Sequence, residues 1–516
     1  MGTETEYGIT VTGGPGFDAG VVSSLVVQGC AGQRGRLGVR WGSDGTYRPG
    51  EGVGDPGFTE DGIHEPPPDV FVSDVPLRNG ARFYVDHAHP EYATPECAGP
   101  YDAMLWDKAG ERIVEAAAEV AAQALRERGA AEPGGQREQL RVLATKNNTD
   151  GKGASYGTHE NYLVDRAVPF DELARQLIPF LVSRQVMVGA GRVGGEHGGA
   201  VYQLSQRSEF FEAEVGAETR RKRPIINTRD EPHADPARFR RFHVIVGDAN
   251  MSEVCTYLKL GSCALVLMMA EDGFLPDPPS LAQPVAALHQ ISRDLSCSCP
   301  LPLAGGGMAT AVQLQWHYLA HAERYLRGRG EPAWGPGVVS TWERVLAALE
   351  RDPMSLAGAV DWVTKHALLA RYVERNGLAW NDDRVKLLDV LYHDVSRTQG
   401  GYHRLAARGG VQTMLAEEDV REAMERPPPG TRARFRDSCL ARYVDDIAQV
   451  DWSVLTFGSP TGGTGSAGSA GTTYRVQLPT PGPIAGPGVE ILERSATAED
   501  FVAALRAADL PDVQVR

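Results

Sequence analysis

Apolar and polar residues alternate in the segment RFYVD, Arg82–Asp86, which predicts a short β-strand. Its apolar residues Phe83 and Val85 fall on one face. The polar residues Arg82, Tyr84 and Asp86 fall on the other face, because side chains two residues apart on a strand point to the same side. An apolar back and a polar front are typical of a strand that lines an active-site groove.

The first residues, MGTETEYGI, predict a second strand over about Glu4 to Val11, with Glu4 and Glu6 on one face. Two neighbouring carboxylates repel each other unless a cation lies between them. Glu91 and Glu96 follow the RFYVD strand. If the two strands pair, Glu4, Glu6 and Glu91 converge, and such oxygen ligands suit Mg²⁺ rather than zinc. For any single glutamate, a solvated surface charge is the more common arrangement.

Helical periodicity is clear in AMLWDKAGERIVEAAAEVAAQALRERG, residues 103–129, where apolar residues recur at spacings of three and four. A charged helix is expected at about 171–182, and mostly helices from 310 to 442. Short strands are expected in QLRVLATKN and RFHVIVGD. The pattern therefore mixes strands and helices, as in an α+β fold.

Proline and glycine divide the chain. A stretch rich in Gly, Pro, Asp and Glu, at about 43–77, predicts a long inserted loop, which we expect to have a gating or regulatory role. The segment PPPGTRARFR, 427–436, marks a boundary, and GSPTGGTGSAGSAGTT is a low-complexity linker or hairpin tip. We expect a main domain over 1–436 and a small C-terminal domain over 437–516.

Composition narrows the function classes. The 516 residues are 42% hydrophobic and carry a formal net charge of −15. This charge disfavours general binding to nucleic acid or anionic membranes, because both require a basic surface. Seven scattered cysteines and a polar, acidic start indicate reduced thiols and a cytoplasmic protein without a signal peptide or membrane span.

Two further segments carry candidate ligand-binding residues. In KNNTDGKGASYGTHENYLV, glycines precede His159 and Asn161, which can ligate a metal and position a phosphate or nucleotide oxygen. Arg207, Arg229 and His243 lie in other polar segments, where arginines can hold a polyphosphate bidentately or form salt bridges with nearby acids. No GxxxxGK[ST] motif occurs.

Two metal motifs are not supported. Cys297 and Cys299 in CSCP lack the spacing and the second pair of a zinc knuckle. His87 and His89 in HAH are surrounded by carboxylates, so a role facing the substrate is at least as plausible as zinc binding.

Together these segments resemble one family, the depupylases, which deamidate the prokaryotic ubiquitin-like protein Pup, and their sister Pup ligases. The resemblance runs through TETEYGI, GARFYVDHAHPEYATPE, KNNTDGKGASYGTHENYL, QRSEFFEAE, NTRDEPHAD, RFHVIVGDANMSE and YHDVSRTQGGYHRL, and so spans most of the main domain. It implies a glutamine-synthetase-like fold: a curved antiparallel sheet with packed helices, holding Mg²⁺ and ATP or ADP, plus a small C-terminal domain.

The resemblance also implies roles for individual residues. Asp86 resembles the catalytic nucleophile or acid-base, and the residues alone leave these alternatives open. Metal ligands are implied at Glu4, Tyr84, Glu91 and His159. Nucleotide contacts are implied at Glu6, Arg82, Thr94, Asn161, Arg207, Arg229, His243 and Trp452.

Within the family, HAHPEY and the long insertion favour a depupylase, since ligases resemble GSHPEY. The implied activity is ATP- and Mg²⁺-dependent: deamidation of the C-terminal glutamine of Pup, and cleavage of Pup from lysines of pupylated proteins, by a monomer. The alternatives are a Pup ligase and a nucleotide-dependent adaptor that binds Pup without turnover. Arg432 and Arg436, which follow PPPG, are candidates for contacts with acidic residues of Pup.

Overall fold

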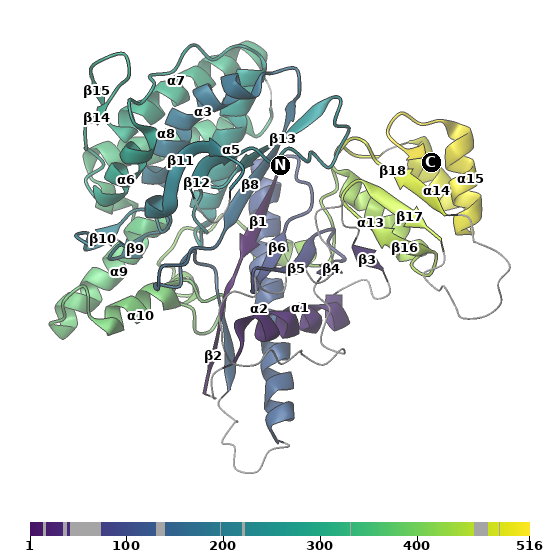
Figure 1. Ribbon diagram of the computed structural model, residues 1–516, viewed down its shortest axis with the longest axis horizontal. Helices are drawn as coiled ribbons and strands as arrows, with labels where there is room; N and C mark the ends of the chain where they lie inside the picture. The colour runs from purple at the N-terminus through teal and green to yellow at the C-terminus, as the bar shows by residue number, and fades with distance from the viewer. Residues whose placement is uncertain are drawn as a thin grey trace.

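The computed structural model describes residues 1–13, 17–34, 39–41, 74–130, 140–196, 198–218, 222–330, 332–458, 473–484 and 486–516. Within them, helices pack on one side of a large sheet, and a smaller unit lies beside it (Figure 1). The predicted α+β class is confirmed.

The main sheet has eight strands in the order β11-β12-β13-β8-β1-β6-β5-β4. Neighbouring strands are antiparallel except β11 and β12, which are parallel. The prediction of an antiparallel sheet is therefore confirmed for every neighbouring pair except β11 and β12. The strands, in chain order, are β1 (Gly2–Glu6), β4 (Asp74–Pro76), β5 (Arg82–Asp86), β6 (His89–Ala93), β8 (Thr158–Asp165), β11 (Phe211–Gly216), β12 (Arg223–Asn227) and β13 (Phe239–Val244).

Long helices cover the back of this sheet. The helices α1 (Ala19–Arg34) and α2 (Pro100–Ala130) contact β5, β6 and β1, while α3 (Phe170–Ser183) and α5 (Glu253–Glu271) contact β12 and β8. The alternation predicted from the RFYVD segment explains this, because Phe83 points into the core of α1 and α2. By length and composition α5 could span a membrane, but 94% of its apolar window is buried inside the protein.

The remaining elements of the main domain are mostly helical, as the sequence predicts for its second half. The single strand expected over about Glu4 to Val11 is divided into β1 and β2 (Gly8–Thr12), and β2 pairs antiparallel with β7 (Arg141–Thr145) in a separate two-stranded sheet. The others are α4 (Gln185–Val188), β9 (Arg192–Val193), β10 (Tyr202–Gln203), a 3₁₀ turn (Ser208–Phe210), α6 (Pro284–Arg293), β14 (Leu301–Pro302), β15 (Met308–Ala309), α7 (Ala311–Arg329), α8 (Gly335–Arg351), a 3₁₀ turn (Pro353–Leu356), α9 (Asp361–Asn376), α10 (Asp383–Tyr392), α11 (Gly401–Ala406) and α12 (Glu417–Ala423).

A second sheet, in the order β19-β18-β17-β16-β3, forms the small C-terminal unit. Its own apolar core includes Phe435, Cys439 and Leu440 of α13 (Arg432–Arg442), so this helix, which runs through the expected boundary at 436, packs with the small unit. Its other elements are β3 (Arg40–Trp41), β16 (Ile447–Val450), β17 (Val454–Phe457), β18 (Tyr474–Gln477), α14 (Pro487–Arg494), α15 (Ala498–Ala508) and β19 (Gln514–Val515).

The predicted inserted loop lies mostly outside the described residues, as does the low-complexity segment. Of the expected range 43–77, residues 43–73 are not described, and residues 74–76 form β4 at the edge of the main sheet. Six of the seven cysteines are buried.

Candidate active site

The register of β1, β6 and β5 brings acidic side chains to the front of the main sheet. The sequence suggested that the RFYVD strand pairs near the first strand, but β6 lies between them. Glu6 on β1 is directly opposite Glu91 on β6, and Glu91 is directly opposite Tyr84 on β5. Directly opposite residues on neighbouring strands point to the same face. The front face therefore carries a row of polar groups across three strands.

Three carboxylates form the first acidic cluster. Ligand oxygens of Glu6, Asp86 and Glu91 all lie within 4.8 Å of one another. Burial and the nearby Asp86, Glu6 and Glu4 raise the pKa of Glu91 well above its usual value. Among the described residues, no Lys or Arg forms an ion pair with these three groups. Such crowding is what a bound cation would relieve.

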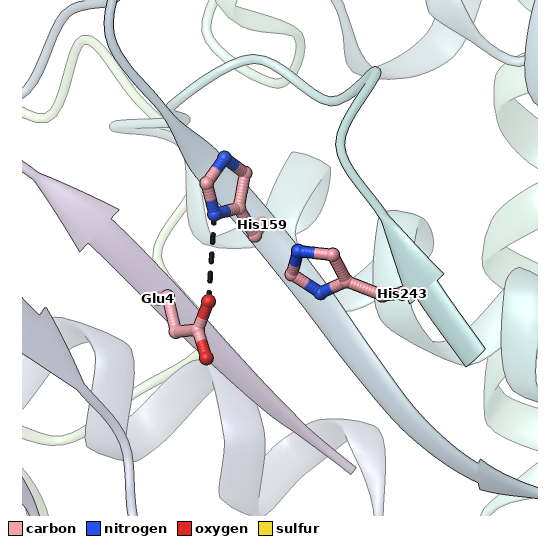
Figure 2. A group of neighbouring side chains, drawn as sticks. All are labelled: Glu4, His159 and His243. Atoms are coloured by element: carbon pink, nitrogen blue, oxygen red, sulfur yellow. Dashed lines mark ion pairs between the residues drawn. The ribbon is translucent and has the colours of Figure 1, made fainter. Parts of the chain in front are cut away.

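A second cluster lies beside the first. Figure 2 shows Glu4 on β1, His159 on β8 and His243 on β13 converging on one space, and their ligand atoms also lie within 4.8 Å of one another. The His159 Nδ1 is 3.4 Å from a Glu4 oxygen. Although burial opposes it, the hydrogen bond from His159 and the charge of Arg241 hold the pKa of Glu4 below its usual range.

His243 is held as a neutral imidazole with a defined orientation. Burial, reinforced by the charge of Arg241, holds its pKa well below the usual value. Its Nδ1 lies 2.7 Å from the Asn161 Oδ1, an arrangement in which the Nδ1–H donates to the amide oxygen. The Nε2 lone pair is then available to a metal or to another donor.

The donor sets fit divalent cations. The first cluster offers only carboxylate oxygens, which suit Mg²⁺, and the second combines one carboxylate with two imidazoles. Tyr84 adds a hydroxyl that hydrogen-bonds to Glu91, and burial raises its pKa well above the usual value, so the phenol is neutral.

Asp86 is the most accessible member of the first cluster, with 40% of its side chain exposed. It ends β5, and the Nδ1 of His87 lies 2.8 Å from one of its carboxylate oxygens. Burial opposes ionisation, but the hydrogen bond and charge of His87 hold the pKa of Asp86 below its usual value. The carboxylate is thus ionised and faces the groove.

Arginines line the other side of the same groove: Arg207, Arg223, Arg229 and Arg241. The Arg207 guanidinium is buried, and its Nη1 donates to the carbonyl of Ile245 at 2.7 Å. Burial and the neighbouring Arg223 lower the pKa of Arg207 to about 9. Several arginines that line one groove beside a row of acids are suited to bind an anionic ligand, with a metal ion between the ligand and the acids.

Arg82 also lines the groove, but its guanidinium is already paired. Its Nε and Nη2 both donate to the Asp74 carboxylate, with 2.5 Å between Nη2 and Oδ2. The guanidinium carbon lies 4.0 Å from the centre of the Tyr84 ring. It therefore lies at the edge of the groove with its orientation fixed by β4.

A more apolar pocket continues from this groove. Thr94, Asn161 and Trp452 line it, together with Met1, Leu163 and Pro481, and Trp452 and Arg241 line both spaces. The Thr94 hydroxyl accepts a hydrogen bond from the Thr3 amide at 2.9 Å, so it also fixes β1 beside β6. Trp452 comes from the C-terminal unit, and this unit therefore forms one wall of the pocket.

The structure brings all of the sequence-predicted site residues to these two connected spaces. Thr94 and Asn161 line the pocket, Trp452 lines both, and the rest line the groove. Arg223, Arg241 and Tyr156 also line the groove but were not predicted. Arg241 stands two residues before His243 on the same strand face, a spacing that would have identified it.

The predicted role of Arg432 and Arg436 in contacting Pup is wrong in this structure. Both side chains are only 2% exposed, and both donate to the carboxylate of Glu96, at 2.6 and 2.9 Å. Despite burial, the two arginines lower the pKa of Glu96 to about 2. These three residues join the end of β6 to α13 and so fix the C-terminal unit beside the pocket.

Comparisons with known proteins agree on one family. The family model described as Pup-ligase protein matches residues 1–456. The chain is 46% identical to a depupylase of Acidothermus cellulolyticus over 98% of both chains. It is 45% identical to a Pup deamidase/depupylase of Mycolicibacterium smegmatis over 89% of this chain and 91% of that protein. It is also 46% identical to a Pup–protein ligase of Kineococcus radiotolerans, over 70% of this chain and 79% of the ligase.

Two solved structures have the same fold. The ligase PafA in complex with Pup matches with a TM-score of 0.78 and 31% identity over 98% of this chain and 93% of that one. PafA in complex with ADP matches with a TM-score of 0.71 and 36% identity over 82% and 89% of the two chains.

Proposed function

The chain belongs to the Pup-ligase protein family, and we propose that within this family it is a Pup deamidase and depupylase. It hydrolyses the side-chain amide of the C-terminal glutamine of Pup, releasing ammonia. It likewise hydrolyses the isopeptide bond between Pup and a lysine, releasing the lysine amine. The observation that carries this proposal is the 46% identity to a depupylase along almost the whole length of both chains.

The geometry of the groove supports amide hydrolysis. Asp86 is an ionised carboxylate at the mouth of the acidic cluster, while the other cluster members are more buried. It can attack the amide carbonyl directly, or it can take a proton from the water that attacks. Arg207 and Arg223 are buried cations that line the groove, and they can stabilise the negative charge that develops on the carbonyl oxygen.

We assign the two acidic clusters to Mg²⁺. Glu6 and Glu91 supply carboxylate oxygens, Glu4 and His159 flank them, and Asp86 stays free to face the amide. When bound, the ion supplies charge neutralisation for ligand phosphates and polarises oxygen atoms. The raised pKa of Glu91 supports this assignment, because a cation would make its ionised form favourable.

We assign ATP or ADP to the groove and the pocket together. The pocket beside Trp452 and Leu163 offers apolar surface for a base, and Asn161 and Thr94 offer polar atoms at its edge. Arg229, Arg241 and Arg207 line the groove that continues from it and suit phosphates. The structure of a family member solved in complex with ADP supports nucleotide binding in this family.

Mass spectrometry tests the proposal. Pup ending in glutamine is incubated with the protein, ATP and Mg²⁺, and deamidation raises its mass by about one unit, since NH₂ becomes OH. A pupylated protein should release free Pup in the same mixture. No mass change and no release would refute the proposal, and would also be the result expected of the adaptor alternative.

The ligase alternative has support of its own, because both solved structures are ligases and one ligase is 46% identical over 70% of the chain. A ligase would join Pup ending in glutamate to a lysine and release ADP. Single-turnover incubation with such a Pup and a target protein separates the two activities. Monomeric state and cytoplasmic location stay predictions, which light scattering and cell fractionation test.

A further inference from the structure

A two-residue turn joins β5 to β6 immediately after Asp86. Asp86 pairs with His89 as the last pair of the two strands, so His87 and Ala88 form the turn. Both have left-handed backbone conformations, with φ of 45° and 69°. Hairpin turns of this kind require positive φ at both central positions and usually use Asn or Gly there. His87 and Ala88 therefore adopt this conformation at a cost in backbone strain.

Two hydrogen bonds accompany the strained turn. The Ser23 hydroxyl on α1 donates to the carbonyl of Ala88 at 2.7 Å, which attaches the turn to a helix of the core. The His87 Nδ1–H donates to the Asp86 Oδ2 at 2.8 Å. The left-handed φ of His87 is what allows its ring to reach the carboxylate of the residue before it.

The hydrogen bond from His87 bears on how the Asp86 carboxylate is oriented. Its side chain is 40% exposed, and no described Lys or Arg pairs with it. Without a partner from the protein, the carboxylate could rotate, and a reacting group has to be held close to its productive geometry. The bond from His87 occupies Oδ2 and leaves Oδ1 for the substrate or water.

We propose that His87 is a positioning residue for amide hydrolysis: its Nδ1–H, presented by the strained turn that Ser23 anchors, orients the Asp86 carboxylate toward the scissile amide. This inference rests on the proposed function. His87 does not itself react, and its contribution is to kcat rather than to binding of Pup or nucleotide.

Three variants of the full-length protein test this role. His87→Gly removes the donor and also relieves the backbone strain, so its melting temperature should equal or exceed that of the parent. Its kcat for deamidation should nevertheless fall by about tenfold or more, with KM for Pup unchanged. A residue with a merely structural role would not give this combination of retained stability and lost turnover.

Ala88→Gly is the matched control, because it relieves strain in the same turn without removing a hydrogen bond to Asp86. We expect its kcat to stay within about twofold of the parent. His87→Asn should recover part of the lost kcat, since Asn tolerates a left-handed φ and its amide can donate to Asp86.

The outcomes separate this inference from the proposed function. An active parent with a His87→Gly variant of equal kcat overturns the role of His87 alone. Equal losses in His87→Gly and Ala88→Gly also overturn it, because the backbone of the turn would then be responsible. His87→Asn no better than His87→Gly counts against the hydrogen bond. A parent that leaves Pup unchanged removes the proposed function, and this role with it.

Discussion

Acidic side chains lie on both sides of the eight-stranded sheet, and the two sides differ in how their charge is balanced. Behind the sheet, Glu160 is buried against Arg184, with 2.8 Å between one pair of their atoms. Glu111 on α2 is fully buried between Lys108 and Lys146, at 2.8 and 2.9 Å. On the front, no described Lys or Arg forms an ion pair with Glu6, Asp86 or Glu91.

This difference separates structural charges from functional ones. An unpaired buried charge is costly, so a charge that serves the fold is kept with its counter-charge. Among the described residues, Glu6, Asp86 and Glu91 lack a Lys or Arg partner, and they are close enough to repel one another. A cation or substrate from solution would balance their charge, as proposed above, and the two sides should respond differently to substitution.

The largest effect is expected on the front. Asp86→Asn should lower turnover of Pup by about a thousandfold or more, which is at least about 4 kcal/mol of transition-state stabilisation. Nucleotide affinity should stay within about tenfold of the parent, since Asp86 is proposed to act on the amide. Deamidation kinetics and nucleotide titration measure the two effects, and retained turnover would contradict the assignment.

A somewhat smaller effect is expected behind the sheet, on stability instead of turnover. Arg184→Met leaves Glu160 buried with the Tyr162 hydroxyl as its one remaining hydrogen-bond donor among the described residues, and we expect the free energy of unfolding to fall by about 3 kcal/mol in urea titrations. The double variant with Glu160→Gln should recover most of this loss. Glu6→Gln on the front is the matched comparison and should not destabilise the protein.

The paired carboxylate of Glu111 should also make stability depend on pH. Burial opposes ionisation, but Lys108 and Lys146 lower the pKa of Glu111 from 4.5 to about 2. Its ionised form therefore stabilises the fold above about pH 4.5, and this contribution is lost as the pH falls toward 2. Glu111→Gln should reduce the loss of unfolding free energy on acidification by about 2 kcal/mol. Urea titrations at several pH values measure it, and an unchanged pH dependence would argue against the pairing.

The smallest expected effect is that of Mg²⁺ on the front acids. At ten times its dissociation constant, the ion should raise the free energy of unfolding by about 1.4 kcal/mol. Glu91→Gln should abolish this shift, whereas Arg184→Met should retain it despite its lower stability. Thermal unfolding with and without Mg²⁺ measures both variants, and an equal shift in both would place the ion elsewhere.

The sequence predicted local features of the site well. The same-face spacing of Glu4 and Glu6, and the limits of the strand Arg82–Asp86, follow from a period of two and appear in the structure unchanged. The helix expected over 103–129 lies within α2. These features depend on neighbours in the chain, whose preferences can be read directly from the residues.

The parts that could not be predicted depend on partners far away in the chain. The position of β6 between β1 and β5 decides that Glu6 faces Glu91, and strand order is not encoded in any single strand. Arg432 and Arg436, which follow PPPG, were interpreted as candidates for contacts with acidic residues of Pup. Their partner, Glu96, precedes them by more than three hundred residues, and only the folded chain shows that all three are buried.

The pairing of β3 with β16 has a consequence for how the protein is made. Arg40 lies beside Gln449, and the same small unit carries Trp452 to the apolar pocket. At ordinary rates of synthesis, the ribosome needs on the order of half a minute to travel between these two residues. Once Glu91 has been translated, the nascent chain contains the acidic cluster but still lacks Trp452, which lines the pocket. Products that end before Trp452 should therefore have no catalytic activity. Only a chain translated almost to its end should be active.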